Sequence, residues 1–471
     1  MRQQRVLVRA VDLGTSEEQV RPRTRRRAGA HARPGFWTGV WSVRTRRSTT
    51  SARRVMVLTV ADQGASSVSN FALALIVAHY SSASALGVFA ILTTTYIVSQ
   101  GLVRSMSSDC LLTRSETDGG LRLTYERAGY LAAIVLAVSL AVLVLAVSGA
   151  LPAAFTLPFV VFAVSFPLMA CQDYSRYIGI SRYDPAYAIR LDIAWLVLFL
   201  VAYAVLRHAG LTSLSWLFGA WSGTGALVGL WTVRAHLSGA GRRRLLRFWD
   251  ESERGVGLRF AGQFLLVTSW TYLISYLLLF VLSLAAIGEF KLSQLALGPI
   301  TVLLAGLQSA LIALAATRFQ IDTRRAIRFL ALGALGAGVL TLAWTALVYA
   351  APVHTMTSVF GRSWPAARRI VPYAGAAVAL SGIAGAATSG LRAMRAASEN
   401  LRLALVMVPF LFVLCLGGAK LDGTVGAAGG LAVAGAIYSV LGWWLLVKVA
   451  RGFVPGISDV VPDAIAEMAE P

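Results

Sequence analysis

The feature that most constrains this chain is a series of apolar runs between Met56 and Val449. Each run is long enough to cross a bilayer, and short connectors rich in Arg, Gly and Ser separate the runs. A spanning helix needs roughly 20 mostly apolar residues, because its backbone polar groups must pair within the helix where water is absent. Hydrophobic residues make up 57% of the chain and charged residues 14%, which excludes the soluble, disordered and fibrous classes. The sequence predicts an all-α polytopic membrane protein.

The apolar runs predict about twelve transmembrane helices. Both termini then lie on one side of the membrane, and most of the Lys and Arg residues in the connectors fall on that side. The positive-inside rule therefore predicts cytoplasmic termini, and it explains the net charge of +21 without a nucleic-acid partner. The predicted spans are residues 56–78, 86–106, 128–149, 153–172, 187–206, 213–233, 258–282, 287–317, 328–350, 366–390, 400–417 and 424–449.

These spans divide the chain into five regions. The basic residues before Met56 contain no apolar signal region, so disorder is expected there, and translation from Met56 instead of Met1 is an open alternative. The connector after the sixth span alternates apolar residues with Arg and fits an interfacial helix or a solvated linker equally well. The predicted regions are a tail at 1–55, an N-terminal six-helix lobe at 56–233, a basic cytoplasmic linker at 234–257, a C-terminal six-helix lobe at 258–449 and a cytoplasmic tail at 450–471.

A short internal repeat supports the division into two lobes. Residues 85–89 read Ala-Leu-Gly-Val-Phe, and residues 286–290 read Ala-Ile-Gly-Glu-Phe, 201 positions later. Six crossings separate the copies, so both lobes have the same orientation and are related by an axis along the membrane normal. This arrangement predicts a central cavity between the lobes as the substrate site.

Polar residues inside spans are the candidates for that cavity, since they are costly at membrane depth. Interhelical hydrogen bonding is the alternative role for each of them. Pro299 in the eighth span removes one backbone hydrogen bond and predicts a kink. The candidate cavity residues are Asp62, Gln63, Asn70, Tyr96, Gln100, Arg104, Arg190, Asp192, Arg259, Gln263, Gln294 and Gln308.

Five of these candidates are charged and are expected near the cytoplasmic ends of their helices. They are Asp62, Arg104, Arg190, Asp192 and Arg259. Arg grips phosphate through paired N–H bonds, so the arginines predict an intake for a diphosphate headgroup. The alternative is that each Arg extends to lipid phosphates at the membrane surface.

The sequence lacks the motifs of common enzyme classes. It has no GxxxxGK[ST] phosphate loop, no HExxH and no GxSxG. The three cysteines and five histidines follow no metal-ligand spacing. We expect neither enzyme activity nor a cofactor or metal.

The first two spans carry a family resemblance. The run Ala-Asp-Gln-Gly-Ala-Ser-Ser-Val-Ser-Asn-Phe at 61–71, continued through 76–78, 81–85 and Leu-Gly-Val-Phe at 86–89, resembles the opening of bacterial polysaccharide and O-antigen flippases. The segments at 361–369 and 390–393 resemble a later region of the same proteins. These flippases belong to the multidrug/oligosaccharidyl-lipid/polysaccharide exporter superfamily.

The resemblance implies an inner-membrane flippase of bacteria that moves a polyprenyl-diphosphate-linked oligosaccharide by alternating access for cell-surface polysaccharide synthesis. It implies cavity roles for Asp62, Gln63 and Asn70 by motif, and by position for Gln100, Arg104, Gln263 and Gln308. The expected partners are the lipid-linked glycan, the bilayer, and a glycan polymerase or glycosyltransferases, with the chain acting as a monomer. Drug export within the superfamily, a membrane-embedded glycan polymerase or transferase, and a scaffold are the alternatives.

Overall fold

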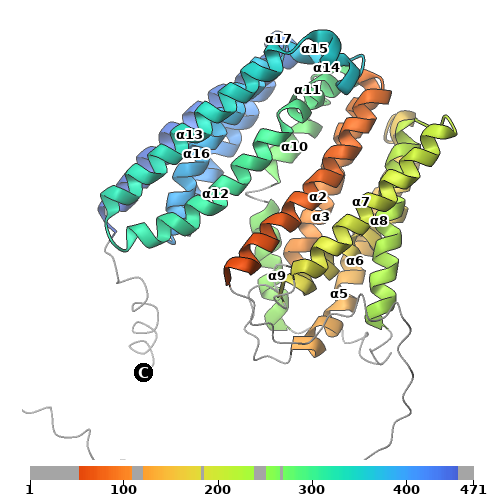
Figure 1. Cartoon of the computed structure of the whole chain (residues 1–471), viewed down its shortest axis with the longest axis horizontal. Helices are drawn as coiled ribbons and strands as arrows, with labels where there is room; N and C mark the ends of the chain where they lie inside the picture. Colours follow the sequence, from red (N-terminus) through yellow and green to blue (C-terminus); the bar gives the residue numbers. More distant parts are fainter. Residues whose placement is uncertain (1–51, 109–119, 182–184, 238–250, 266–268, 454–471) are drawn as a thin grey trace, which may run out of the picture. The chain divides into compact units, whose positions relative to one another are not determined.

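The computed structural model describes residues 52–108, 120–181, 185–237, 251–265 and 269–453, which all belong to one compact unit (Figure 1). These residues form α-helices joined by short connections, and no strand occurs among them. The predicted terminal tails, apart from the first turn of α2 and the end of α17, and residues 238–250 of the predicted linker lie outside the described ranges. The helices are α2 (Ala52–Tyr80), α3 (Ala83–Met106), α5 (Gly120–Val147), α6 (Ala153–Ser181), α7 (Pro185–His208), α8 (Leu214–Leu237), α9 (Glu251–Gln263), α10 (Trp270–Leu278), α11 (Leu284–Ala296), α12 (Gly298–Phe319), α13 (Thr323–Ala350), α14 (Val353–Phe360), α15 (Trp364–Arg368), α16 (Val371–Ala393) and α17 (Ala397–Arg451).

The order of these helices confirms the twelve predicted crossings. Seven of the described helices are long and apolar enough to cross a membrane by themselves. The seventh crossing is divided into α9 and α10, and the eighth into α11 and α12. The eleventh and twelfth crossings run together as α17, with non-helical backbone angles only at Asp422 and Gly423, where the chain turns back. The short helices α14 and α15 join the ninth and tenth crossings.

The division of the eighth crossing confirms the kink predicted at Pro299. Helix α11 ends before Leu297, and α12 begins at Gly298 with Pro299 in its first turn. Proline has no N–H to donate at this position, so a new helix start accommodates it more easily than a helix interior does. In the seventh crossing, α9 ends at Gln263, residues 264 and 265 are π-helical, and the backbone N–H of Ser269 donates to the carbonyl of Phe264 at 2.9 Å. No proline marks this change in the sequence.

Helices α2 to α8, which we call the N-terminal bundle, pack through large aromatic side chains. Trp221 is 2% exposed and lies against Trp195, Phe218 and Tyr96, with ring centroids 4.8, 5.6 and 5.2 Å away. The indole N–H of Trp195 donates to the backbone carbonyl of Trp221 at 2.8 Å. Rings of this size bury much apolar surface, and their packing joins α3, α7 and α8.

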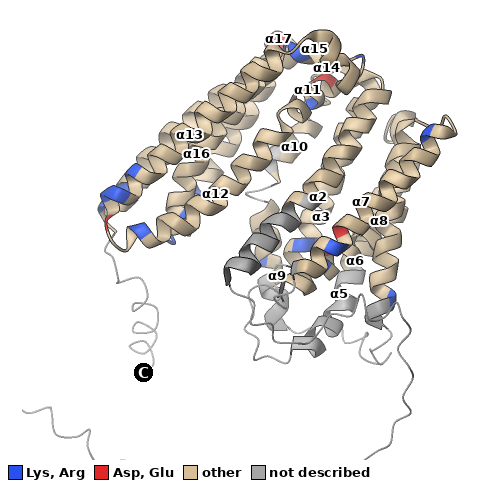
Figure 2. Ribbon diagram, viewed as in Figure 1, with Lys and Arg blue, Asp and Glu red and all other residues tan. Residues whose placement is uncertain are grey.

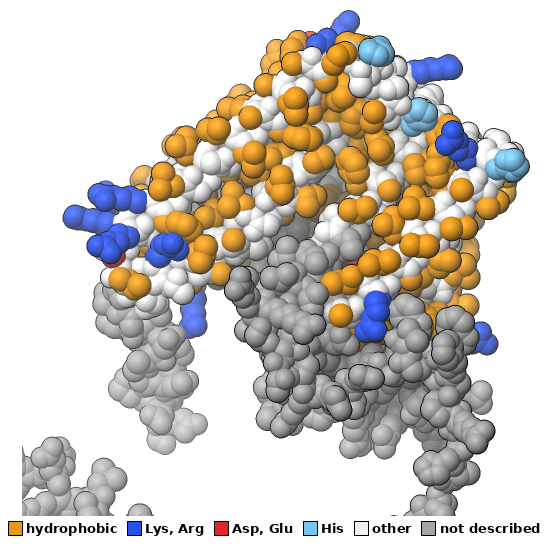
Figure 3. All heavy atoms as spheres, viewed as in Figure 1, with side chains coloured by type: hydrophobic (Ala, Val, Ile, Leu, Met, Phe, Trp, Pro, Cys, Tyr) orange, Lys and Arg blue, Asp and Glu red, His pale blue; other side chains and the backbone are white. Residues whose placement is uncertain are grey.

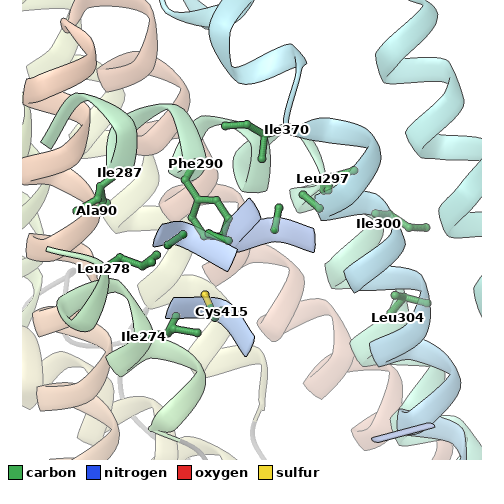
Figure 4. Packing of buried hydrophobic residues seen from close by; sticks show 14 of the residues in the cluster. Ala90, Ile274, Leu278, Ile287, Phe290, Leu297, Ile300, Leu304, Ile370 and Cys415 are labelled. Atoms are coloured by element: carbon green, nitrogen blue, oxygen red, sulfur yellow. The ribbon is translucent and has the colours of Figure 1, made fainter. Parts of the chain in front are cut away.

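Helices α9 to α17, which we call the C-terminal bundle, pack mainly through small residues. Helix α16 buries alanines and glycines along most of its length against α13 and α17. A side chain on Gly430 would overlap the carbonyl of Leu414, so the two halves of α17 touch through their backbones. Larger apolar residues of α11 and α12 complete this core, and Figure 4 shows Phe290 and Ile370 near Cys415.

The surface matches a membrane environment. Exposed leucines and valines lie along α5, α7, α12, α13 and α17. In the view of Figure 3, hydrophobic side chains cover the lengths of the helices, while Lys and Arg side chains gather near the helix ends. This distribution fits a protein whose sides contact lipid and whose ends contact water.

Candidate functional site

A seam of glycine contacts joins the two bundles where α2 ends and α3 and α11 begin. A side chain on Gly87 of α3 would overlap the carbonyl of Leu284, and one on Gly288 of α11 would overlap the carbonyl of Ala83. Gly361, with a φ of 81°, likewise leaves no room for a side chain against the carbonyl of Ala78. We call Gly87, Gly288 and Gly361 the glycine seam.

The contact between Gly87 and Gly288 is reciprocal. Each glycine approaches the first residue of the other helix, and a Cβ on Gly288 would lie 2.9 Å from the backbone nitrogen of Gly87. The helices also begin alike, since Ser82 and Ser283 are N-caps whose side chains accept from the backbone N–H three residues later. All these pairs keep the 201-residue offset of the sequence repeat. The starts of α3 and α11, which are equivalent in the two repeats, therefore contact each other through the same set of positions, as two subunits do in an isologous dimer interface.

Side chains also connect the bundles next to the seam. The hydroxyls of Thr95 on α3 and Tyr276 on α10 form a hydrogen bond of 2.6 Å. Further along α3, Phe264 lies where a side chain on Gly101 would stand. Helix α3 thus follows the seventh and eighth crossings over much of its length.

A buried charge network lies inside the N-terminal bundle. Arg104 of α3 donates two hydrogen bonds to Asp173 of α6, at 2.8 and 3.2 Å. Arg176 pairs with Asp173 and also with Asp192 of α7, at 3.1 Å in both cases. Gln172 donates to Asp192 at 3.1 Å. Among the described residues, two guanidinium groups thus face two carboxylates, and such pairing offsets the cost of burying charges. Figure 2 shows basic and acidic positions close together in this part of the bundle.

Arg104 is the most accessible member of this network. Its side chain is 34% exposed, whereas those of Asp173, Arg176 and Asp192 are at most 6% exposed. Its guanidinium also lies 5.2 Å from the ring centroid of Tyr177, a cation–π distance. Arg104 is therefore the member of this network with the most surface that a ligand could contact.

The structure brings together four of the predicted site residues, all in or beside this network. Tyr96 packs its ring against Phe162 and Trp221, and Gln100 is 4% exposed beside Asp173. These two residues, with Arg104 and Asp192, lie on helices packed within the N-terminal bundle. Their contact with substrate stays a prediction.

Of the other predicted residues with described side chains, two have known contacts and four are exposed. Arg190 donates to the carbonyl of Ala186 in its own helix, and Gln308 packs its side chain over Gly385 of α16. Asn70, Arg259, Gln263 and Gln294 are exposed. Asp62 and Gln63 belong to α2, but their side chains lie outside the described set.

Sequence reasoning missed Gln172 and Asp173 and used Arg176 only for topology. The available signal was a carboxylate directly after the predicted fourth span with an arginine three residues later, which share one face if the helix continues. Gly87 and Gly288 both lie in the repeated five-residue segments, 85–89 and 286–290. The sequence of these segments does not predict that the two glycines touch.

No protein-family model matches the chain, and no curated protein sequence matches it. Solved structures do. The lipid II flippase MurJ in an inward closed conformation has a TM-score of 0.64 over 84% of this chain and 87% of that chain, at 10% identity. The MATE multidrug transporter DinF-BH, solved as a ligand complex, has a TM-score of 0.55 over 84% of this chain and 94% of that chain, at 15% identity. The chain has the MurJ and MATE transporter fold.

A third similar structure is the bent form of the Vibrio cholerae MATE transporter VcmN. Its TM-score is 0.51 over 85% of this chain and 97% of that chain, at 14% identity. The similarity to the MurJ and MATE structures confirms the predicted fold of about twelve transmembrane helices. Identities of this size leave the substrate to be argued from the residues.

Proposed function

We propose that the chain is a membrane transporter that moves a polyprenyl-diphosphate-linked oligosaccharide across the bacterial inner membrane by alternating access, without covalent chemistry. The observation that carries this proposal is the glycine seam. At the seam, glycines at equivalent positions of the two repeats let the backbone of one bundle contact the backbone of the other, with no side chain between them. Such a contact closes tightly and opens without breaking an ion pair, as a reversible gate requires.

The charge network supports an anionic substrate over a cationic drug. Asp173 and Asp192 are held by Arg104 and Arg176, so neither carboxylate is available to a cation. The partly exposed group of the network is the Arg104 guanidinium, which suits a diphosphate. Under the positive-inside rule, Arg104 lies toward the cytoplasm and the seam toward the outside.

Reconstituted vesicles test this function. The full chain is placed in vesicles with a fluorescent polyprenyl-diphosphate-linked oligosaccharide, and an impermeant glycosidase reports how fast the glycan changes leaflet. We expect movement of this lipid and none of a glycan-bearing polyprenyl chain that lacks the diphosphate. Transport of a cationic dye in place of the glycolipid would identify a drug exporter, and elongation of the glycan would identify a polymerase.

The seam provides a variant for the same assay. Leucine at position 288 (Gly288→Leu) would drive a side chain into the backbone of α3, and overpacking of this kind costs about 1–3 kcal/mol. The closed state would lose about tenfold or more in population, and transport would fall with it. Gly336→Leu is the matched control, because nothing lies within 4 Å of a side chain there. Equal transport by the two variants would contradict the gate.

A further inference from the structure

Lys291 occupies a distinctive position on α11. Gly288, three residues before it, touches α3, and Phe290, directly before it, packs into the C-terminal bundle. Figure 4 shows the Phe290 ring directed toward Cys415. Successive residues of an α-helix are about 100° apart, so Lys291 projects between the face that contacts α3 and the face that packs into the C-terminal bundle.

Lys291 is deep in the protein and still accessible. The residues on either side of it, Phe290 and Leu292, are 4% and 1% exposed, and the surrounding protein desolvates its ammonium group, yet Lys291 itself is only half-buried. A lysine that faced the lipid would be less surrounded, and a lysine packed in a core would be closed off. These two properties together fit a side chain that projects into an internal space between the bundles.

Lys291 also lacks a counter-ion. Within the described part of the chain, no carboxylate lies within 4.0 Å of its ammonium group, and no acceptor forms a hydrogen bond with it. Glu289, the acidic residue nearest to it in sequence, projects from a different side of α11 and feels the charge of Arg369. An ammonium group that is neither in bulk water nor paired is costly to maintain, and such a residue is a functional candidate by default.

We propose that Lys291 is an anion-binding residue that takes the diphosphate group of the lipid-linked substrate about one helical turn from the glycine seam. This inference rests on the proposed function and deepens it by placing a second headgroup position far from Arg104 along the transport path. Lys provides three donors and a compact charge that suit phosphate oxygens. Gln294, three residues further along the same edge of α11, is exposed and adds an amide donor.

The position near the seam gives Lys291 access to either side of the membrane. Lys291 follows the start of α11 by seven residues, or about 10 Å of helix. While the seam is closed, it faces the space between the bundles. When the seam opens, the same side chain is among the first that the opposite side reaches. One cation can thus hold the headgroup before and after the bundles exchange positions.

Chemical labelling tests this inference directly, because the chain contains only three lysines: Lys291, Lys420 and Lys448. The full chain in lipid nanodiscs is treated with an amine-reactive reagent alone, with farnesyl diphosphate, with farnesol, and with inorganic pyrophosphate. Peptide mass spectrometry then measures labelling at each lysine. At about ten times its dissociation constant, farnesyl diphosphate should lower labelling of Lys291 about tenfold, and farnesol should not.

The other two lysines serve as internal controls. Lys420 is exposed where α17 turns back, and Lys448 lies near the end of that helix over the ring of Trp444. Their labelling should not respond to the diphosphate. Protection of Lys291 by inorganic pyrophosphate as well would show that the headgroup suffices, and protection by the prenyl diphosphate alone would show that the chain is needed too. Unchanged labelling of Lys291, or equal protection at all three lysines, overturns the inference.

Transport by variants separates this inference from the proposed function. Lys291→Gln should lower glycolipid transport about tenfold or more, Lys291→Arg should retain most of it, and Lys420→Gln should match the unmodified chain. Normal transport by Lys291→Gln refutes the inference and leaves the function standing. Protection of Lys291 in a chain that moves no glycolipid refutes the proposed function and keeps the anion-binding residue.

Discussion

The two bundles use opposite solutions for the same arrangement of helices. The N-terminal bundle fills its core with aromatic rings and pairs two aspartates with two arginines, of which Arg176 is buried and Arg104 is partly exposed. The C-terminal bundle packs backbone against backbone through alanine and glycine, and within its described residues it carries Lys291 without a partner. Charge is thus paired in the network of the first bundle, where only Arg104 keeps substantial exposed surface, and unpaired at Lys291 among the described residues of the second. Two copies of a structural repeat can therefore keep the same fold while their charged residues differ in how they are paired.

The largest expected effect tests the structural role of charge in the N-terminal bundle. Asp173→Asn keeps the shape of the side chain but leaves Arg104 and Arg176 without a shared carboxylate. Breaking a buried ion pair on one side costs about 3–5 kcal/mol, so the unfolding temperature in detergent should fall sharply. Arg328→Gln is a charge-removal control at an exposed residue of α13. An unfolding temperature unchanged by Asp173→Asn would refute the structural role of the network.

The next effect tests the small-residue packing of the C-terminal bundle. Gly430→Leu would place a side chain against the backbone of Leu414, and overpacking should cost about 1–3 kcal/mol of stability. Gly417→Leu in the same helix is the control, since nothing lies within 4 Å of a side chain there. Thermal unfolding of both variants measures the difference. Equal stabilities would mean that the close approach of the two halves of α17 is not required.

A smaller effect concerns an exposed carboxylate at the start of α13. Hydrogen bonds from the backbone N–H groups of Arg325 and Arg324 hold the pKa of Asp322 below its ordinary value of about 3.9. A lowered pKa means that the stabilisation is present above the ordinary value and is lost as the pH falls through the lowered one. Asp322→Ala should therefore lower the unfolding temperature slightly at neutral pH and not at the acid end. A constant difference at all pH values would contradict this N-cap role.

The smallest effect on stability is expected at Lys291. Its removal takes away a desolvated charge and breaks no ion pair within the described residues. Lys291→Gln should therefore unfold at the same temperature as the unmodified chain or at a slightly higher one. A large fall in unfolding temperature for Asp173→Asn and none for Lys291→Gln would show that the two bundles use charge differently. A large loss of stability would show that Lys291 is a packing residue.

The sequence by itself determined the class, the number of crossings and the place of one helix break. These are local properties, because an apolar run of about 20 residues forms a spanning helix whatever its neighbours are. The break at Pro299 follows from the missing N–H of proline in the same local way. The repeat strings around Gly87 and Gly288 also marked the positions where the two halves correspond.

Only the tertiary structure decided which groups meet. Arg104 and Asp192 were both predicted near the cytoplasmic ends of their helices, and the structure shows that Asp173 and Arg176 join them within one bundle. Lys291 belongs to the predicted eighth span, and only the packing of α11 shows that it lies between the contact of Gly288 with α3 and the packing of Phe290 in the C-terminal bundle. The physical reason is that the rotation of each helix about its axis depends on packing with all its neighbours. A run of apolar residues fixes that a helix crosses the membrane, and the packing fixes what each of its polar residues faces.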